Sequence, residues 1–171
     1  MRKKLIGLLG ICLLAVVIPT VAINAQEKPV EKDVAQEKPY DPKADAQKDI
    51  DGLIAKAKKE KKNIVIQAGG NWCVWCLRFN DYIHQTKSVA DLIKDNYVYY
   101  HLNYSPENKN EAVFNKYAPG KGKEFGYPFF IVMDATGKVL TVRESGNLES
   151  GASYDESKVL AFFKEWVPKK K

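Results

Sequence analysis

Cysteine and histidine are scarce in this chain of 171 residues, which has three cysteines and two histidines. Cys12 lies in the apolar N-terminal segment, so the remainder of the chain cannot build a disulfide framework. A structural zinc site needs four ligands, and only Cys73, Cys76, His84 and His101 are available, at spacings that do not indicate convergence. The scarcity argues against a small disulfide-stapled protein and against a zinc domain.

A large excess of charge of one sign is also lacking. The formal net charge is +6, from 27 basic and 21 acidic residues. Three of the basic residues, Arg2, Lys3 and Lys4, lie within residues 1–25, which contain no acid; without that segment 24 basic residues face 21 acidic ones. Such a mild balance predicts neither a nucleic-acid-binding surface nor a polybasic membrane patch. The apolar fraction of 45% is enough for the packed core of one domain.

The N-terminal segment has the layout of an export signal. Basic residues at Met1–Lys4 precede an apolar run from Leu5 to Ile23, and small residues follow up to Ala25. This pattern predicts a signal peptide over 1–25, with Ala25 as the last residue removed. A run of this length also suits an uncleaved anchor over 5–23. Either alternative places the rest of the chain in the periplasm or on the outer face of the membrane.

The next segment is rich in proline and charge. Residues 26–44 contain a ten-residue near-repeat, and of the aromatic residues only Tyr40 precedes Trp72. This composition predicts a disordered tether over 26–44, because it cannot bury enough apolar surface to offset the entropy of ordering. The folded domain is therefore expected over 45–167, followed by a basic tail at 168–171.

Hydrophobic periodicity predicts an element order of α-β-α-α-β-α-β-β-α. Capping boxes are expected where Ser88 precedes Asp91 and where Ser153 precedes Glu156. Alternating strands and helices followed by a hairpin and a helix predict an α/β fold with a central mixed β-sheet covered by helices on both faces. The expected strands span 63–68, 97–104, 129–133 and 139–143. Two expected helices span 45–61 and 107–117, and three more begin near Cys73, Ser88 and Ser153.

Two cysteines three residues apart, Cys73 and Cys76, follow a predicted buried strand and open a predicted helix. The first is expected to be exposed at the helix N-terminus, where free N–H groups and the helix dipole stabilise a thiolate. The second is expected beneath it, on the buried face of the helix. Cys73 is thus the candidate nucleophile and Cys76 the candidate resolving thiol of a disulfide-exchange reaction.

Other roles for the cysteine pair fit the sequence less well. Covalent haem attachment requires histidine directly after the second cysteine, where this chain has Leu77. A purely structural disulfide stays open as an alternative. It would crosslink very little chain, so the entropic stabilisation would be small. Redox activity is the favoured interpretation.

At the segment Trp72–Cys76 and at Tyr127-Pro128, and through the element order over nearly all of 45–167, the chain resembles the thioredoxin-like family. It is similar to exported thioredoxin-like proteins and to the periplasmic C-terminal domain of transmembrane thiol:disulfide interchange proteins. The resemblance implies a thioredoxin-like fold and a cis peptide at Tyr127-Pro128 that faces the cysteines. It also implies that the backbone of this loop pairs with bound substrate. From the sequence alone, Pro128 is equally compatible with an ordinary proline at the start of a strand.

The sequence departs from the family at two places. The family has a buried aspartate six residues before the first cysteine, where this chain has Gln67, which cannot accept a proton. Between the cysteines stand Val74 and Trp75 in place of glycine and proline. Trp75 either enlarges an apolar contact for a partner polypeptide or packs within the fold.

These features predict an exported thiol:disulfide oxidoreductase, and the resemblance favours a reductase. Cys73 and Cys76 are the expected catalytic residues, and the expected substrate-binding residues are Trp72, Trp75, Tyr127 and Pro128. The expected partners are client proteins with disulfides or thiols and a membrane-bound or soluble redox partner, with no nucleic acid, and the chain is expected to be a monomer. No metal or organic cofactor is implied, because the cysteine pair carries the two electrons. The alternative is a protein-binding module of the same fold that uses the aromatic surface and has a merely structural disulfide.

Overall fold

The computed structural model describes residues 38–169. The expected signal peptide or anchor and the first part of the expected tether lie outside the described residues, as does the end of the basic tail. Within residues 38–169 no helix is both long and apolar enough to cross a bilayer.

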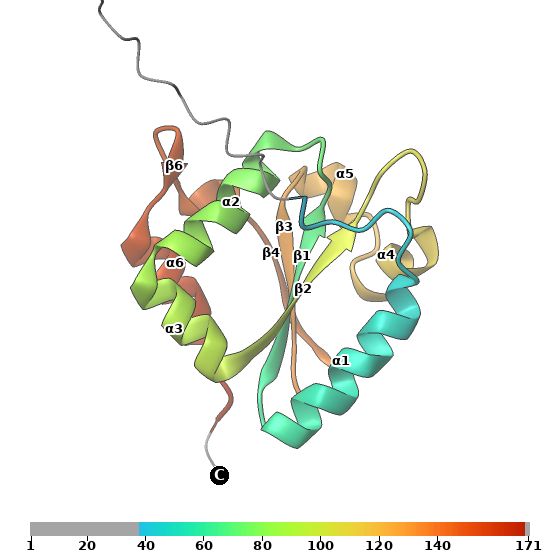
Figure 1. Ribbon diagram of the computed structural model, residues 1–171, viewed down its shortest axis with the longest axis horizontal. Coiled ribbons are helices and arrows are strands. Elements are labelled where there is room, and N and C mark those ends of the chain that lie inside the picture. Colours follow the sequence, from blue (N-terminus) through green and yellow to red (C-terminus); the bar gives the residue numbers. More distant parts are fainter. Residues whose placement is uncertain (1–37, 170–171) are drawn as a thin grey trace, which may run out of the picture. The chain divides into compact units, whose positions relative to one another are not determined.

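A four-stranded mixed sheet forms the centre of the described chain (Figure 1). Its order is β2-β1-β3-β4, with β1 parallel to β2 and antiparallel to β3. All seven residues of β1 are buried, as expected of a strand covered on both faces. The strands are β1 (Asn63–Gly69), β2 (Tyr97–Asn103), β3 (Phe129–Met133) and β4 (Val139–Glu144).

Helices cover both faces of this sheet, so the predicted thioredoxin-like α/β fold is confirmed. In Figure 1, α1 and α4 lie on one side and α2, α3 and α6 on the other. A small hairpin, β5–β6, precedes α6. The bounds are α1 (Ala46–Glu60), α2 (Val74–Gln85), α3 (Lys87–Asn96), α4 (Glu111–Tyr117), α5 (Lys121–Phe125), a 3-10 turn η1 (Gly146–Leu148), β5 (Glu149–Ser150), β6 (Ser153–Tyr154) and α6 (Glu156–Glu165).

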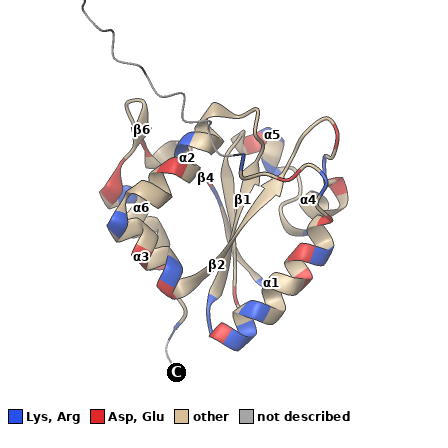
Figure 2. Cartoon of the chain, in the orientation of Figure 1, with Lys and Arg blue, Asp and Glu red and all other residues tan. Residues whose placement is uncertain are grey.

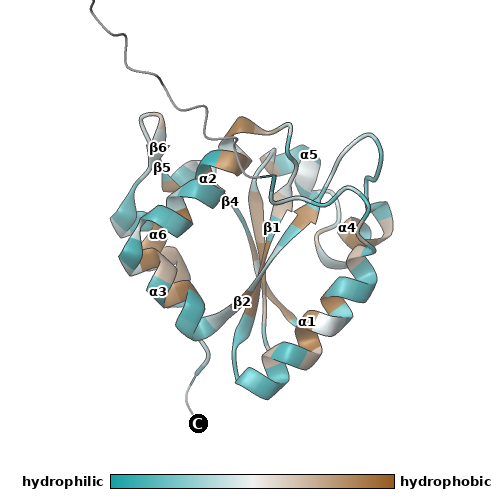
Figure 3. Cartoon of the chain, in the orientation of Figure 1, coloured by the Kyte–Doolittle hydropathy of each residue, from teal (hydrophilic) through white to brown (hydrophobic). Residues whose placement is uncertain are grey.

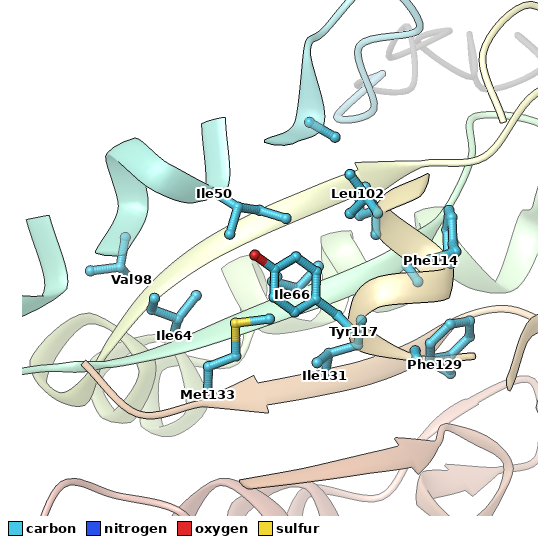
Figure 4. Close-up of a cluster of buried hydrophobic side chains, with 14 of the residues drawn as sticks. Ile50, Ile64, Ile66, Val98, Leu102, Phe114, Tyr117, Phe129, Ile131 and Met133 are labelled. Atoms are coloured by element: carbon cyan, nitrogen blue, oxygen red, sulfur yellow. The ribbon is translucent and has the colours of Figure 1, made fainter. Parts of the chain in front are cut away.

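The sheet separates two apolar cores, because successive side chains of a strand point to opposite faces. Ile64 and Ile66 of β1 belong to the core under α1, where Ile50 packs (Figure 4). Val65 of β1 belongs to the core under α2, α3 and α6, where Phe163 packs. Hydrophilic residues occupy the outward faces of the helices, and charges of both signs alternate along α1 (Figures 2 and 3).

Both predicted capping boxes are wrong. The N-cap residue of α3 is Thr86 and the helix begins at Lys87, so Ser88 lies inside the helix. The Ser88 hydroxyl donates to Glu156 of α6. At α6 the cap is Asp155, whose carboxylate accepts from the Lys158 N–H. Ser153 lies in β6 instead. Ser88 is therefore engaged by a distant helix and Ser153 by the adjacent strand of its own hairpin.

The connection between β2 and β3 also differs from the expectation. The helix predicted over 107–117 begins only at Glu111, because asparagine side chains hold residues 105–110 in a turn: Asn108 and Asn110 each bond to nearby backbone groups. The glycine-rich loop that follows contains the short helix α5. Gly120 (φ 75°) and Gly126 (φ 70°) flank α5 in backbone conformations that suit glycine.

The packed chain begins earlier than residue 45. Tyr40, predicted to lie in a disordered tether, is 1% exposed and contacts the cysteine pair. The segment before α1 runs across the sheet end at which β1 and β2 finish (Figure 1). The prediction of a disordered tether is therefore wrong for the segment around Tyr40, because the ring of Tyr40 is buried in a site that local composition does not reveal.

Candidate functional site

Cys73 and Cys76 form a disulfide at the N-terminus of α2, with Cα atoms 5.2 Å apart. Cys73 is the N-cap residue, and the backbone N–H of Cys76 donates to its Sγ over 3.1 Å. Cys76 is fully buried, while Cys73 is 6% exposed and thus more covered than the sequence predicted. Cys73 is thus the more exposed of the two cysteines.

The start of α2 is electrostatically suited to a sulfur anion. The free N–H groups and the dipole of α2 place partial positive charge beside Cys73. Within the described chain the first turn of α2 contains no acidic side chain that would oppose this charge. Phe79 and Ile83, on the face of α2 that carries Cys76, are buried in the core, so the helix end is fixed against the sheet.

The loop before β3 faces the disulfide. The Tyr127-Pro128 peptide is cis, which confirms the geometry implied by the family resemblance. The Tyr127 carbonyl oxygen lies 3.5 Å from Cys73 Sγ, and Pro128 is buried. Burial raises the pKa of the Tyr127 hydroxyl to about 12, so this ring is neutral at physiological pH.

Aromatic side chains surround the Cys73 sulfur unequally. Trp72 is 57% exposed and packs edge-to-face on Tyr127, while its indole N–H donates to the Tyr104 carbonyl over 2.6 Å. Trp75 is partly buried and packs edge-to-face on Tyr154, with the Arg78 guanidinium 4.9 Å from its ring centre. Of the two alternatives for Trp75, the structure therefore shows a packing contact, and Trp72 is the more accessible tryptophan.

Val74 is a rim residue that was not among the substrate-binding residues expected from the sequence. Its side chain is 53% exposed, directly after Cys73. The helical phase contained the signal, since Val74 does not share the buried face that carries Cys76 and Phe79. Together Trp72 and Val74 give the entrance of the site an apolar surface.

Gln67 occupies the position that holds an acid in the family, and its amide is fully engaged. The side chain is fully buried. Its Nε2 donates to the Tyr40 hydroxyl over 2.6 Å and to the Cys76 carbonyl over 3.0 Å, and its Oε1 accepts from the Tyr99 hydroxyl over 2.6 Å. None of these partners, within the described residues, is a carboxylate.

The titratable groups around Gln67 are uncharged near neutral pH. Burial raises the pKa of Tyr40 and of Tyr99 well above the ordinary tyrosine value. Burial also lowers the pKa of His101 to about 4, and the ring of His101 contacts both tyrosines. His101 is therefore a neutral packing residue here. In the described part of the chain, no three His, Cys, Asp or Glu side chains gather as a metal site would require.

Asn71 attaches the N-terminal segment to the cysteine loop. Its Nδ2 donates to the Tyr40 carbonyl over 2.7 Å, and its Oδ1 accepts from the Tyr40 N–H over 3.2 Å. Neither Tyr40 nor Asn71 was identified from the sequence. The one available signal was that Tyr40 is the only aromatic residue before Trp72.

Gly69 provides the space in which these groups meet. A Cβ at this position would lie 2.5 Å from Cys76 Sγ and 2.8 Å from the Tyr40 hydroxyl oxygen. We expect Gly69→Ala to lower the free energy of unfolding by about 1–3 kcal/mol, the usual cost of overpacking a core. Urea unfolding measures this effect.

Gly52→Ala is the matched control for that substitution. Nothing lies within 4 Å of a Cβ at Gly52, in the middle of α1. This variant should gain stability, by up to about 1 kcal/mol, because alanine is the better helix former. Equal effects of the two variants would contradict the close approach at Gly69.

Comparisons with known proteins agree with this geometry. A family model described as thioredoxin-like matches residues 45–135. The comparison with curated protein sequences gave no match. Among solved structures, a disulphide isomerase from Xylella fastidiosa Temecula1 aligns with a TM-score of 0.65 and 24% identity, over 77% of this chain and 98% of that one. This likeness shows a shared fold.

Two further structures align less well. An oxidoreductase named DsbH has a TM-score of 0.44 and 23% identity, over 66% of this chain and 77% of its own. A thioredoxin-fold protein from Helicobacter pylori has a TM-score of 0.38 and 17% identity, over 61% and 81%. The family match covers more than half of the sequence and includes both cysteines, and on this basis the chain belongs to the thioredoxin-like family.

Proposed function

We propose that this chain is a thiol:disulfide oxidoreductase that exchanges disulfides with client proteins through Cys73 and Cys76. The observation that carries the proposal is the Cys73–Cys76 disulfide at the N-terminus of α2, in which Cys73 is 6% exposed and Cys76 fully buried. A purely structural disulfide would not require the two cysteines to differ in exposure. The helix end stabilises the sulfur anion that forms when the bond is reduced.

The exchange proceeds in two balanced steps. The Cys73 thiolate attacks a client disulfide, forms a mixed disulfide and releases one client thiolate. The Cys76 thiolate then attacks Cys73 Sγ, which restores the Cys73–Cys76 bond and releases the second client thiolate. The client gains two electrons, the pair loses two, and the client thiolates take up protons from water.

The client is proposed to bind across the rim next to Cys73. Trp72 offers an exposed apolar face, and Trp75 and Tyr127 flank the sulfur from α2 and from the loop before β3. The peptide group of Tyr127-Pro128 lies close enough to Cys73 for its backbone to pair with an extended client segment. An unfolded or extended polypeptide fits such a site better than a small molecule does.

The proposal extends to direction and location. We take the reaction as reduction of client disulfides, outside the cytoplasm, by a monomer that receives electrons from a membrane-bound or soluble redox partner. The basic and apolar pattern of residues 1–25 supports export. The resemblance to the interchange-protein domain supports the reductive direction.

Equilibration of the full-length chain in graded glutathione buffers tests the proposal, with thiol content read by a maleimide gel shift. We expect the pair to titrate at about −270 mV, the value typical of a reductant. A value of about −120 mV would overturn the reductive direction. No titration would overturn the oxidoreductase itself, and a variant with both cysteines replaced by serine controls for unrelated thiols.

A protein-binding module is the second candidate. It is favoured by the apolar exposure of Trp72 and Val74, which are 57% and 53% exposed. In that case the aromatic rim would hold a partner while the disulfide stays oxidised. An inert disulfide in the glutathione titration, together with partner binding that persists without the cysteines, would support this candidate.

A further inference from the structure

Tyr40 lies against the buried end of the cysteine pair although it comes from outside the predicted domain. It is 1% exposed and forms one apolar cluster with Cys73 and Cys76. Asn71, two residues before Cys73, fixes the backbone of Tyr40 by accepting from its N–H and donating to its carbonyl. The loop that carries the reactive sulfur therefore also fixes the position of Tyr40.

The hydrogen bonds of Gln67 determine how the Tyr40 hydroxyl is oriented. The Gln67 amide nitrogen faces the Cys76 carbonyl, which can only accept, and its amide oxygen faces the Tyr99 hydroxyl. The same nitrogen donates to Tyr40, so the Tyr40 oxygen is the acceptor in that bond. Among residues 38–169 no hydrogen bond uses the Tyr40 proton as donor.

The Cys76 sulfur borders the same small space as this hydroxyl. A Cβ at Gly69 would lie 2.5 Å from Cys76 Sγ and 2.8 Å from the Tyr40 oxygen, so both atoms border the space beside Gly69. In the disulfide, Cys76 Sγ is a weak acceptor. As a thiolate it becomes a charged acceptor, and a buried anion requires a hydrogen-bond donor to stabilise it.

We propose that the Tyr40 hydroxyl donates a hydrogen bond to the Cys76 thiolate that forms while Cys73 is linked to a client. Tyr40 thus completes the redox centre from the segment before α1. This inference rests on the proposed function. Unlike a carboxylate, Tyr40 does not remove a proton: the Cys76 proton leaves to water, and the tyrosine keeps its own while stabilising the anion that attacks Cys73 Sγ.

The other titratable groups packed around Cys76 and Tyr40 do not replace this donor. The Tyr99 proton is taken by Gln67, and the Tyr154 proton by the Trp75 carbonyl. The His101 ring packs against Tyr40 at an interplanar angle of 75°, and Tyr127 stacks on Tyr104. Cys73 itself is occupied by the client in the mixed disulfide. Tyr40 is the described tyrosine that borders the space beside Gly69 and Cys76 Sγ and whose proton has no acceptor in the structure.

The test follows the second step of the exchange in the full-length chain. Reduced protein is mixed with glutathione disulfide, and release of glutathione from Cys73 by Cys76 is timed by mass spectrometry across pH 5–9. In Tyr40→Phe we expect release at neutral pH to be about ten-fold slower, because a hydrogen bond to a charged group is lost. The pH of half-maximal rate should rise. In Tyr40→Phe the rate at which Cys73 is alkylated should equal the wild-type rate.

Matched variants separate this role from general packing. Tyr100→Phe removes a hydroxyl that donates to Asp49 on the opposite face of β2, and its pH profile should stay at the wild-type position. Asn71→Ala releases the backbone of Tyr40 and should slow release in the same direction as Tyr40→Phe, which supplies a second test if Tyr40→Phe unfolds.

An unchanged pH profile in Tyr40→Phe or, if that variant unfolds, in Asn71→Ala overturns the inference while the proposed function stands. Failure of the wild-type pair to react with glutathione disulfide overturns the proposed function itself. The two failures are distinguished by the wild-type reaction alone.

Discussion

A Cys76→Ser variant is expected to accumulate disulfide-linked adducts with its clients. Cys73 remains at the N-terminus of α2 and still attacks the client, but the buried residue that would resolve the mixed disulfide has lost its thiol. We expect adducts on non-reducing gels after acid trapping, and their disappearance on reduction. The oxidised clients can then be identified by mass spectrometry.

A Cys73→Ser variant is the matched control, since it differs from Cys76→Ser only in which sulfur remains. The remaining Cys76 is fully buried, so it has no route to a client. We expect exchange to fall to the background rate of the buffer and no adducts to form. Adducts of equal abundance in both variants would contradict the assignment of Cys73 as nucleophile. Unchanged activity in both would support the binding module.

The sheet and the main helices could be predicted because their signals are local. The run Asn63–Ala68 is apolar throughout, as a strand covered on both faces must be, and Ile50 and Ala57 recur at helical spacing. The predicted cap failed at Ser88 for the opposite reason, because its hydroxyl donates to Glu156 of another helix, 68 residues away. At Ser153 it failed because this residue pairs with Ser150 in the β5–β6 hairpin.

The cysteines could likewise be placed from the sequence, because a strand followed by a helix start determines where two residues of that spacing lie. The side chains that surround the cysteines could not be predicted in this way. The bonds from Asn71 to Tyr40 join residues 31 positions apart, and Gln67 meets the Tyr99 hydroxyl across 32 positions. A sequence that offers one isolated tyrosine in a charged segment contains no local sign of such contacts.

Phe79 has the largest predicted effect on stability. Its ring is fully buried one turn after Cys76, 4.7 Å from the ring centres of both Phe130 and Tyr154. It thereby joins α2 to the sheet and to the β5–β6 hairpin. Phe79→Ala leaves a cavity in this core and is expected to cost about 3–5 kcal/mol of unfolding free energy, a large share of the total for one domain.

Urea unfolding of Phe79→Ala beside Leu140→Ala measures that effect against a matched apolar truncation. Leu140 is 36% exposed on β4, at the edge of the sheet, so its removal leaves no enclosed cavity and should cost less than about 1 kcal/mol. Because Phe79 fixes the helix end that presents Cys73, reaction with glutathione disulfide should also become sensitive to low urea in Phe79→Ala alone. Equal losses in the two variants would mean that α2 is fixed by its neighbours and not by this ring.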